Sequence, residues 1–180
     1  MKRIMHISAV SFALLTLLFY AVGYFYPNAV CFSLFVTFLT FAYHFIMRLL
    51  VGFLTGFLPE KVSNCGNFWF RPKKAERKIY EFLKVKRWKK YIPTYDVESF
   101  SVEKHSLEEI SITMCRAEIT HEIIALFSFV PILFSLKFGE LAVFVITSVV
   151  AAVIDTVFVV VQRYNRPRVL RLIRIKEKIN

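Results

Sequence analysis

Four long apolar stretches divide this chain of 180 residues, and its charged residues are concentrated between and beyond them. A helix needs about 20 apolar residues to cross a hydrocarbon core roughly 30 Å thick, because each residue adds about 1.5 Å. The stretches therefore predict an all-α, polytopic membrane protein with four transmembrane helices and a single domain, 1–180. The predicted spans are about 4–26, 29–48 with an interfacial continuation to 58, 119–136 and 141–161.

The first stretch has an alternative interpretation as a secretory signal peptide, because Lys2 and Arg3 precede it and Ala21-Val22-Gly23 is a weak cleavage signal. The apolar run continues beyond that signal to Tyr26, which favours an uncleaved membrane helix. Pro131 lies inside the third stretch and predicts a kink there, since proline has no backbone N–H for the helix.

Composition and cysteine spacing exclude several other classes. Hydrophobic residues make up 57% of the chain, which is too many for a disordered basic tail or a simple nucleic-acid-binding module. The three cysteines, Cys31, Cys65 and Cys115, are odd in number and lack a CxxC spacing, so we predict neither a disulfide framework nor a metal site. Walker A, GxGxxG, GxSxG and HxxxxD motifs are absent from the sequence.

The basic residues predict the orientation in the membrane. Two precede the first span, thirteen lie between residues 60 and 118, and seven follow from residue 163, whereas the short connections hold only Lys137. Basic residues are enriched on the cytoplasmic side of membrane proteins. We therefore expect both termini, the loop 59–118 and the tail 163–180 to be cytoplasmic.

The central loop is itself patterned. Ten Lys and Arg lie between Arg71 and Lys90, and Ile79, Phe82 and Leu83 share one helical face, so we predict an amphipathic basic helix entered through Pro72 at the anionic leaflet. Further on, Ser106-Leu-Glu-Glu109 predicts a capping box that starts a helix running into the third span.

Ionisable residues within spans usually face the protein interior or a wet cavity. We expect those near the predicted inner surface to line one pocket: His44, Arg48, Glu118, His121, Asp155 and Arg163. Alternatively, His44 and Arg48 snorkel to the interface, and Asp155 is more readily a partner for a basic residue than a catalyst.

Two polar motifs stand out at the ends of the last two spans. Glu118 and His121 are three residues apart on one helical face, so the carboxylate can hold one imidazole nitrogen and leave the other as a general base. The alternative is a polar helix end at headgroup level. The motif Gln162-Arg-Tyr-Asn-Arg-Pro-Arg168 either anchors the fourth span by its charge or binds phosphate or carboxylate oxygens.

The chain resembles a known family in three segments, which are Trp88-Lys-Lys-Tyr-Ile-Pro, Arg116-Ala-Glu-Ile-Thr-His121 and Gln162-Arg-Tyr-Asn-Arg-Pro-Arg168. With them, the chain from about Phe68 to Ile173 resembles the glycosyl-4,4'-diaponeurosporenoate acyltransferase family. That resemblance implies a multi-pass enzyme of the bacterial cell membrane that adds a fatty acyl chain to a sugar hydroxyl of a glycosylated carotenoid. Glu122 stands where we expect an aromatic residue in that family, so the acceptor can be another glycolipid.

Our first hypothesis is thus an O-acyltransferase that takes its acyl chain from acyl-CoA or acyl carrier protein and needs no cofactor and no metal. His121 would be the general base and Glu118 would hold its imidazole. The protein would interact with membrane lipids and a lipid acceptor but not with nucleic acid. The residues expected to bind substrate are His44, Arg48, Arg116, Asp155, Arg163, Tyr164, Asn165 and Arg166. The alternatives are a non-catalytic scaffold that binds anionic lipid or a partner protein, and a membrane methyltransferase or reductase.

Overall fold

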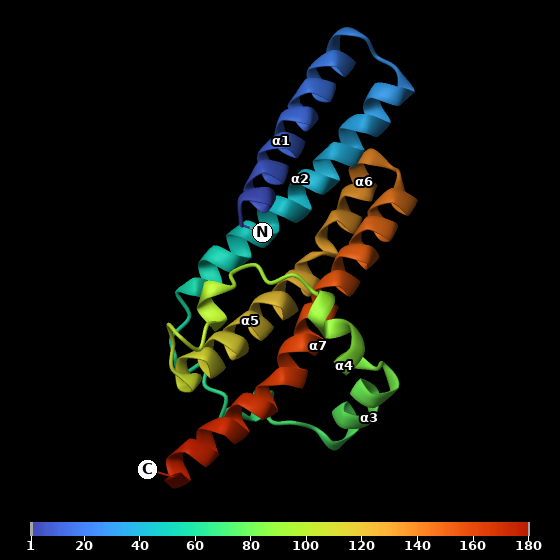
Figure 1. The fold of residues 1–180 in the computed structure, drawn as a ribbon. Helices are drawn as coiled ribbons and strands as arrows, with labels where there is room; N and C mark the ends of the chain where they lie inside the picture. Colours follow the sequence, from blue (N-terminus) through green and yellow to red (C-terminus); the bar gives the residue numbers. More distant parts are fainter. Residues whose placement is uncertain (1, 180) are drawn as a thin grey trace. The chain divides into compact units, whose positions relative to one another are not determined.

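The computed structural model describes residues 2–179, and its regular secondary structure is entirely helical over that range (Figure 1). Four helical segments are long and apolar enough to cross a membrane, as the sequence predicted. They cover Lys2–Phe25, Ala29–Gly56, Leu107–Phe138 and Leu141–Ile179. The chain is therefore an all-α membrane protein with four candidate spans.

The chain forms two compact units, and each is described by itself. Unit 1 comprises Met1–Phe53 and Ile123–Ile154, and unit 2 comprises Leu54–Glu122 and Asp155–Asn180. Three helices contribute residues to both units: α2 (Ala29–Gly56), α5 (Leu107–Phe127) and α7 (Leu141–Ile179).

Unit 1 contains most of the apolar surface of the chain. In it, α1 (Lys2–Phe25) packs on α2 through aromatic rings, with centroids 5.2 Å apart for Phe12 and Phe41 and 5.3 Å apart for Phe19 and Phe38. The outward side of α1 exposes large aliphatic side chains such as Leu14, Leu17 and Leu18. An apolar surface of this kind is typical of a helix that faces lipid. The remaining helices of unit 1 are η4 (Val130–Phe134) and α6 (Ser135–Phe138).

Unit 2 contains the polar half of the chain. Its part of α7 lies between α5 on one side and the short helices α3 (Lys74–Phe82) and α4 (Val85–Trp88) on the other (Figure 1). The connecting segments contain three single-turn helices, which are η1 (Phe68–Phe70), η2 (Lys89–Tyr91) and η3 (Glu98–Phe100).

The predicted start of α5 is confirmed. The backbone N–H of Ser106 donates to Glu109 Oε2 at 2.8 Å, and the backbone N–H of Glu109 donates to Ser106 Oγ at 3.2 Å. This reciprocal pair satisfies two donors that a helix end otherwise leaves unpaired. From this cap the helix runs unbroken to Phe127, as expected.

Several helix ends differ from the predictions. Pro131 does not kink a continuous helix, because α5 ends at Phe127 and the proline lies in η4. Pro72 is not the first residue of a helix, because α3 begins at Lys74. The second stretch is one continuous helix to Gly56, and α7 continues through Pro167 to Ile179 where a separate tail was expected. Helix ends are the part of a helix that a local sequence signal determines least closely.

The prediction that the cysteines form no disulfide is wrong. Cys65 and Cys115 are bonded, with Cα atoms 6.1 Å apart and a separation of 50 positions in sequence. The bond links the loop after α2 to α5, three residues before Glu118. Nothing in the spacing of the cysteines signals this pair, because the contact is created by tertiary packing.

Candidate functional site

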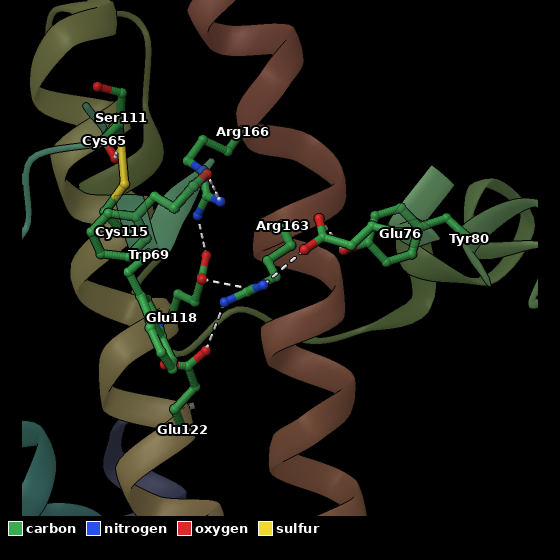
Figure 2. Close-up of polar contacts among 11 residues, drawn as sticks. Cys65, Trp69, Glu76, Tyr80, Ser111, Cys115, Glu118, Glu122, Arg163 and Arg166 are labelled. Atoms are coloured by element: carbon green, nitrogen blue, oxygen red, sulfur yellow. Dashed lines mark hydrogen bonds and ion pairs between the residues drawn. A yellow bond between two sulfur atoms is a disulfide. The ribbon is translucent and has the colours of Figure 1, made fainter. Parts of the chain in front are cut away.

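The centre of unit 2 is a cluster of buried charges built around Arg163 of α7 (Figure 2). The Arg163 guanidinium donates to three carboxylates. Its Nε lies 2.7 Å from Glu118 Oε1, its Nη1 lies 2.9 Å from Glu76 Oε1, and its Nη2 lies 3.1 Å from Glu122 Oε1. Glu118 and Glu122 come from α5, whereas Glu76 comes from α3, so this one side chain joins three helices.

Arg166, one turn further along α7, completes the cluster. Its Nη1 donates to Glu118 Oε2, its Nη2 donates to the backbone carbonyl of Phe70 at 2.6 Å, and its guanidinium lies 5.1 Å from the centre of the Phe70 ring. Glu118 is 0% exposed and Arg166 is 1% exposed. Burial of an ion pair contributes little net stability, but removal of one partner leaves an uncompensated charge and costs about 3–5 kcal/mol.

His121 lies beside this cluster and pairs with a different carboxylate from the one expected. Its Nδ1 lies 3.0 Å from Asp155 Oδ1 of α7, and its ring stacks on Phe158 with centroids 4.6 Å apart. Asp155 is 1% exposed, whereas the His121 side chain is 22% exposed. The structure thus places Asp155, and not Glu118, against His121, which corrects the predicted partner of this imidazole.

The reason for this difference is geometric. Residues at i and i+3 share a helical face, but here the carboxylate of Glu118 is directed to the arginines of α7. Asp155 approaches from the neighbouring helix and occupies the position beside the imidazole. As the sequence suggested, Asp155 is a partner for a basic residue.

Glu122 has two partners and connects the cluster to the loop after α2. Trp69 Nε1 donates to Glu122 Oε2 at 2.8 Å, and the Arg163 guanidinium lies 6.0 Å from the centre of the Trp69 ring. The carboxylate at position 122 therefore accepts hydrogen bonds that a phenylalanine or tryptophan could not accept.

The rest of the arginine-rich motif is tied to the segment after α4. Lys89 Nζ donates to Asn165 Oδ1 and lies 4.9 Å from the centre of the Tyr164 ring, which also contacts Tyr80 and Arg168. Burial, and then the charge of Arg168, lower the pKa of Lys89. Burial, and then the neighbouring Glu76 carboxylate, raise the pKa of Tyr80, so its phenol stays protonated.

The other candidate residues lie elsewhere. Arg116 is in unit 2, where its Nη2 donates to the carbonyl of Leu58 at 3.3 Å. His44 and Arg48 are in unit 1, where Arg48 Nη2 donates to the carbonyl of Ala151 at 3.3 Å and His44 is buried. That these two residues line one pocket with His121 stays a prediction.

Sequence reasoning missed Trp69, Phe70 and Glu76, which complete the cluster from outside α5 and α7, and it also missed Phe158 of α7, which stacks on His121. Glu76 offered the clearest signal, since it is one of only two acids between Arg71 and Lys90. An acid isolated among ten basic residues is a natural candidate for an internal ion pair. Trp69, Phe70 and Phe158 are aromatic residues among many and carried no signal of their own.

The arrangement can support acid–base chemistry. With Nδ1–H donated to Asp155, His121 Nε2 becomes the nitrogen that accepts a proton, and Asp155 stabilises the imidazolium that forms. Among residues 2–179, no group of three or more His, Cys, Asp and Glu side chains is arranged to hold a metal ion.

An all-helical protein with four candidate membrane spans and a histidine paired with a buried aspartate is thus the class that fold and site define. Comparison with known proteins gives the family. The family profile of glycosyl-4,4'-diaponeurosporenoate acyltransferase matches residues 66–175, which include every cluster residue, and the chain belongs to this acyltransferase family of carotenoid biosynthesis.

One relative illustrates the degree of similarity. The glycosyl-4,4'-diaponeurosporenoate acyltransferase of Staphylococcus aureus (strain MRSA252) is 31% identical over 120 residues, which are 66% of this chain and 67% of the relative. No solved structure matches the chain significantly.

Proposed function

We propose that this protein is an integral-membrane O-acyltransferase that moves a fatty acyl chain from a thioester donor to a hydroxyl of a glycosylated carotenoid or related glycolipid. The donor is acyl-CoA or acyl carrier protein. The observation that carries the proposal is the pairing of His121 with the buried Asp155, in a chain of an acyltransferase family.

The proposed reaction uses His121 as the general base. His121 Nε2 takes the proton of the acceptor hydroxyl as its oxygen attacks the thioester carbonyl. The new C–O ester bond forms, the C–S bond breaks, and the imidazolium returns the proton to the departing thiolate sulfur. Asp155 orients the ring through Nδ1–H and stabilises its positive charge, while Phe158 holds the ring plane.

The charge cluster supports this site indirectly. The sequence predicts that Arg163, Asn165 and Arg166 hold donor phosphates or the developing oxyanion. In the structure these side chains have other partners, which are Glu76, Glu118, Glu122, Lys89 and the Phe70 carbonyl. We therefore propose that Arg163 and Arg166 are positioning residues. They hold α5 against α7, and the relative placement of these helices brings His121 to Asp155.

The test is lipid mass spectrometry on cells that express the wild-type protein, the His121→Ala variant or no protein. The wild type should yield a glycolipid heavier by one acyl residue, and His121→Ala should not. Equal amounts of both proteins in the membrane fraction provide the control for folding. If His121→Ala supports the same acylated lipid, the imidazole is not the base. If the wild type yields no acylated lipid but its loss changes the membrane association of a partner protein, the chain is a scaffold.

A further inference from the structure

A concave, strongly basic surface lies on the segment that follows α3. It has a volume of about 600 Å³ and is lined by Lys86, Arg87, Trp88, Lys90 and Tyr91, which we call the α4–η2 surface. This volume lies within the range of roughly 300–1,000 Å³ that is typical of small-ligand sites. None of the contacts that build the charge cluster uses these five side chains.

The backbone beneath this surface is fixed by several contacts. Lys84 adopts a left-handed conformation with φ of 51°, which turns the chain sharply between α3 and α4, and Val85 is completely buried. Trp88 Nε1 donates to the carbonyl of Leu83 at 2.8 Å, which fixes the indole. The surface is therefore formed before any ligand binds.

The segment from Lys86 to Tyr91 has two sides, and Lys89 lies on the side that faces α7. Lys89 is directed to α7, where it contacts Asn165 and Tyr164. In contrast, Lys86, Arg87 and Lys90 are exposed on the α4–η2 surface, and so is Tyr91. One cation thus docks the segment onto the site helix. The other three lie on the exposed side, where Lys90 Nζ is 4.9 Å from the centre of the Tyr91 ring.

The chemistry of the surface suits a planar base that carries phosphates. The sequence has no acidic residue between Glu81 and Asp96, so the five cations from Lys84 to Lys90 create an uninterrupted positive field for a multiply charged anion. Lysine and arginine make charge-assisted hydrogen bonds to phosphate oxygens, and the faces of tryptophan and tyrosine rings stack with nucleobases.

We propose that the α4–η2 surface binds the phosphorylated adenosine end of a coenzyme A thioester, the acyl donor. The proposal rests on the proposed function, because it identifies the donor of that reaction. Lys86, Arg87 and Lys90 bind the phosphates, while Trp88 and Tyr91 stack with the adenine. Phosphate is also present in lipid headgroups, but a concave surface with a fixed indole fits a discrete ligand better than it fits a flat bilayer.

Binding is measured on the purified full-length protein in detergent micelles, with adenosine 3',5'-bisphosphate as the probe. Trp88 is one of only two tryptophans, so its quenching should give a saturable fluorescence signal that Trp88→Phe abolishes. The triple variant Lys86→Gln, Arg87→Gln, Lys90→Gln should raise the Kd about tenfold or more, since it removes three charged hydrogen-bond donors. The matched control changes Arg171, Lys176 and Lys178 to Gln, which removes the same charge at exposed positions on α7. This control should change the Kd less than about twofold.

Two further probes distinguish the sources of phosphate. Inorganic phosphate should quench Trp88 only weakly, and vesicles of anionic phospholipid should bind the triple variant and its matched control equally well. The proposal is overturned if the bisphosphate does not bind saturably, or if both triple variants weaken it equally. It is also overturned if vesicles but not the bisphosphate require Lys86, Arg87 and Lys90, because the surface then binds lipid headgroups.

The failure of this proposal can be separated from failure of the proposed function by two measurements on His121→Ala. This variant should bind the bisphosphate like the wild type while it loses acyl transfer. Acyl transfer that proceeds from a carrier-protein thioester, without bisphosphate binding, would overturn the donor assignment and leave the reaction intact. Bisphosphate binding with undiminished transfer by His121→Ala would instead remove the proposed base and leave the α4–η2 surface as a nucleotide site.

Discussion

At the scale of single residues, the two fully buried carboxylates of unit 2 have different partners. Glu118 accepts hydrogen bonds from two permanently charged arginines, so its charge is already compensated before any substrate binds. Asp155 faces an imidazole, whose charge changes when it takes a proton. Asp155 is therefore the carboxylate that can stabilise a charge formed during the reaction, and Glu118 fixes the helices that carry it.

This assignment predicts different losses of activity for His121 and Asp155. His121→Ala should lower turnover at saturating donor by about 100-fold to 10,000-fold, the usual contribution of a general base. Asp155→Asn should lower it by about tenfold or more, because the amide neither stabilises the imidazolium nor selects the same tautomer. The measurement is the rate of acyl transfer, with the membrane-inserted amount of each variant as the control. Full turnover by His121→Ala would move the base to His44.

The arginine cluster leads to a prediction about stability. Arg166→Met should lower the free energy of unfolding by about 3–5 kcal/mol, because Glu118 then loses one of its buried cationic partners. Arg166→Lys should also be destabilising, because an ammonium group cannot reach Glu118 and the Phe70 carbonyl with the same fork of donors. Thermal unfolding in detergent measures both.

The double variant Glu118→Gln, Arg166→Met provides the control for this prediction. It should recover part of the stability, since it removes the buried charge together with its partner. If each single variant unfolds like the wild type, the cluster does not hold the helices together.

At the scale of helices, the sequence predicted the elements better than their contacts. The four spans were evident because a run of about 20 apolar residues is the length that crosses a membrane. Ser106 and Glu109 marked the start of α5 because a capping box is a local motif. The contact of His121 with Asp155 could not be predicted in this way. It depends on how α5 and α7 pack. The spacing within α5 alone suggested Glu118 as the partner of His121.

The same reasoning explains which helix ends were wrong. Proline signals depend on whether a neighbour compensates for the missing hydrogen bond. Pro167 lies inside α7, just after Arg163 and Arg166, which form ion pairs with α3 and α5, and the helix continues. Pro131 lies in η4, a 3-10 helix that begins after α5 has ended at Phe127.

The attachment of α3 to α7 gives a prediction at this scale. The only ion pair between these helices joins Glu76 to Arg163 within the described residues, and both side chains are largely buried. Glu76→Gln should therefore speed amide hydrogen exchange in Lys74–Phe82 by about 10-fold to 100-fold, since a charged hydrogen bond is worth about 1.5–3 kcal/mol. Glu81→Gln is the matched control, because Glu81 pairs with Arg77 at the exposed side of the same helix and should change little. Equal exchange in both variants would contradict this role of Glu76.

At the scale of the whole molecule, the charge distribution and the disulfide give opposite indications. The two, thirteen and seven basic residues of the N-terminus, central loop and tail favour cytoplasmic locations for all three. Cys65 and Cys115, however, are bonded within that same loop, and disulfides persist mainly in oxidising compartments. We propose the cytoplasmic location, because it rests on the distribution of many charges along the chain and the cysteine pair can open in a reducing cytosol.

This proposal predicts the state of the cysteines in living cells. If the loop is cytoplasmic, Cys65 and Cys115 should be thiols there, and denaturation in the presence of a maleimide should label both. A Cys31→Ser background leaves only these two cysteines, so the number of labels reports on the pair alone. The same protein, purified in air, should become unreactive until a reductant is added, because the two Cα atoms already lie at disulfide distance. Cysteines that are protected from maleimide in freshly denatured cells would place the loop on the oxidising side of the membrane. The arginines of unit 2 would then face outward, and the orientation inferred from the basic residues would be wrong.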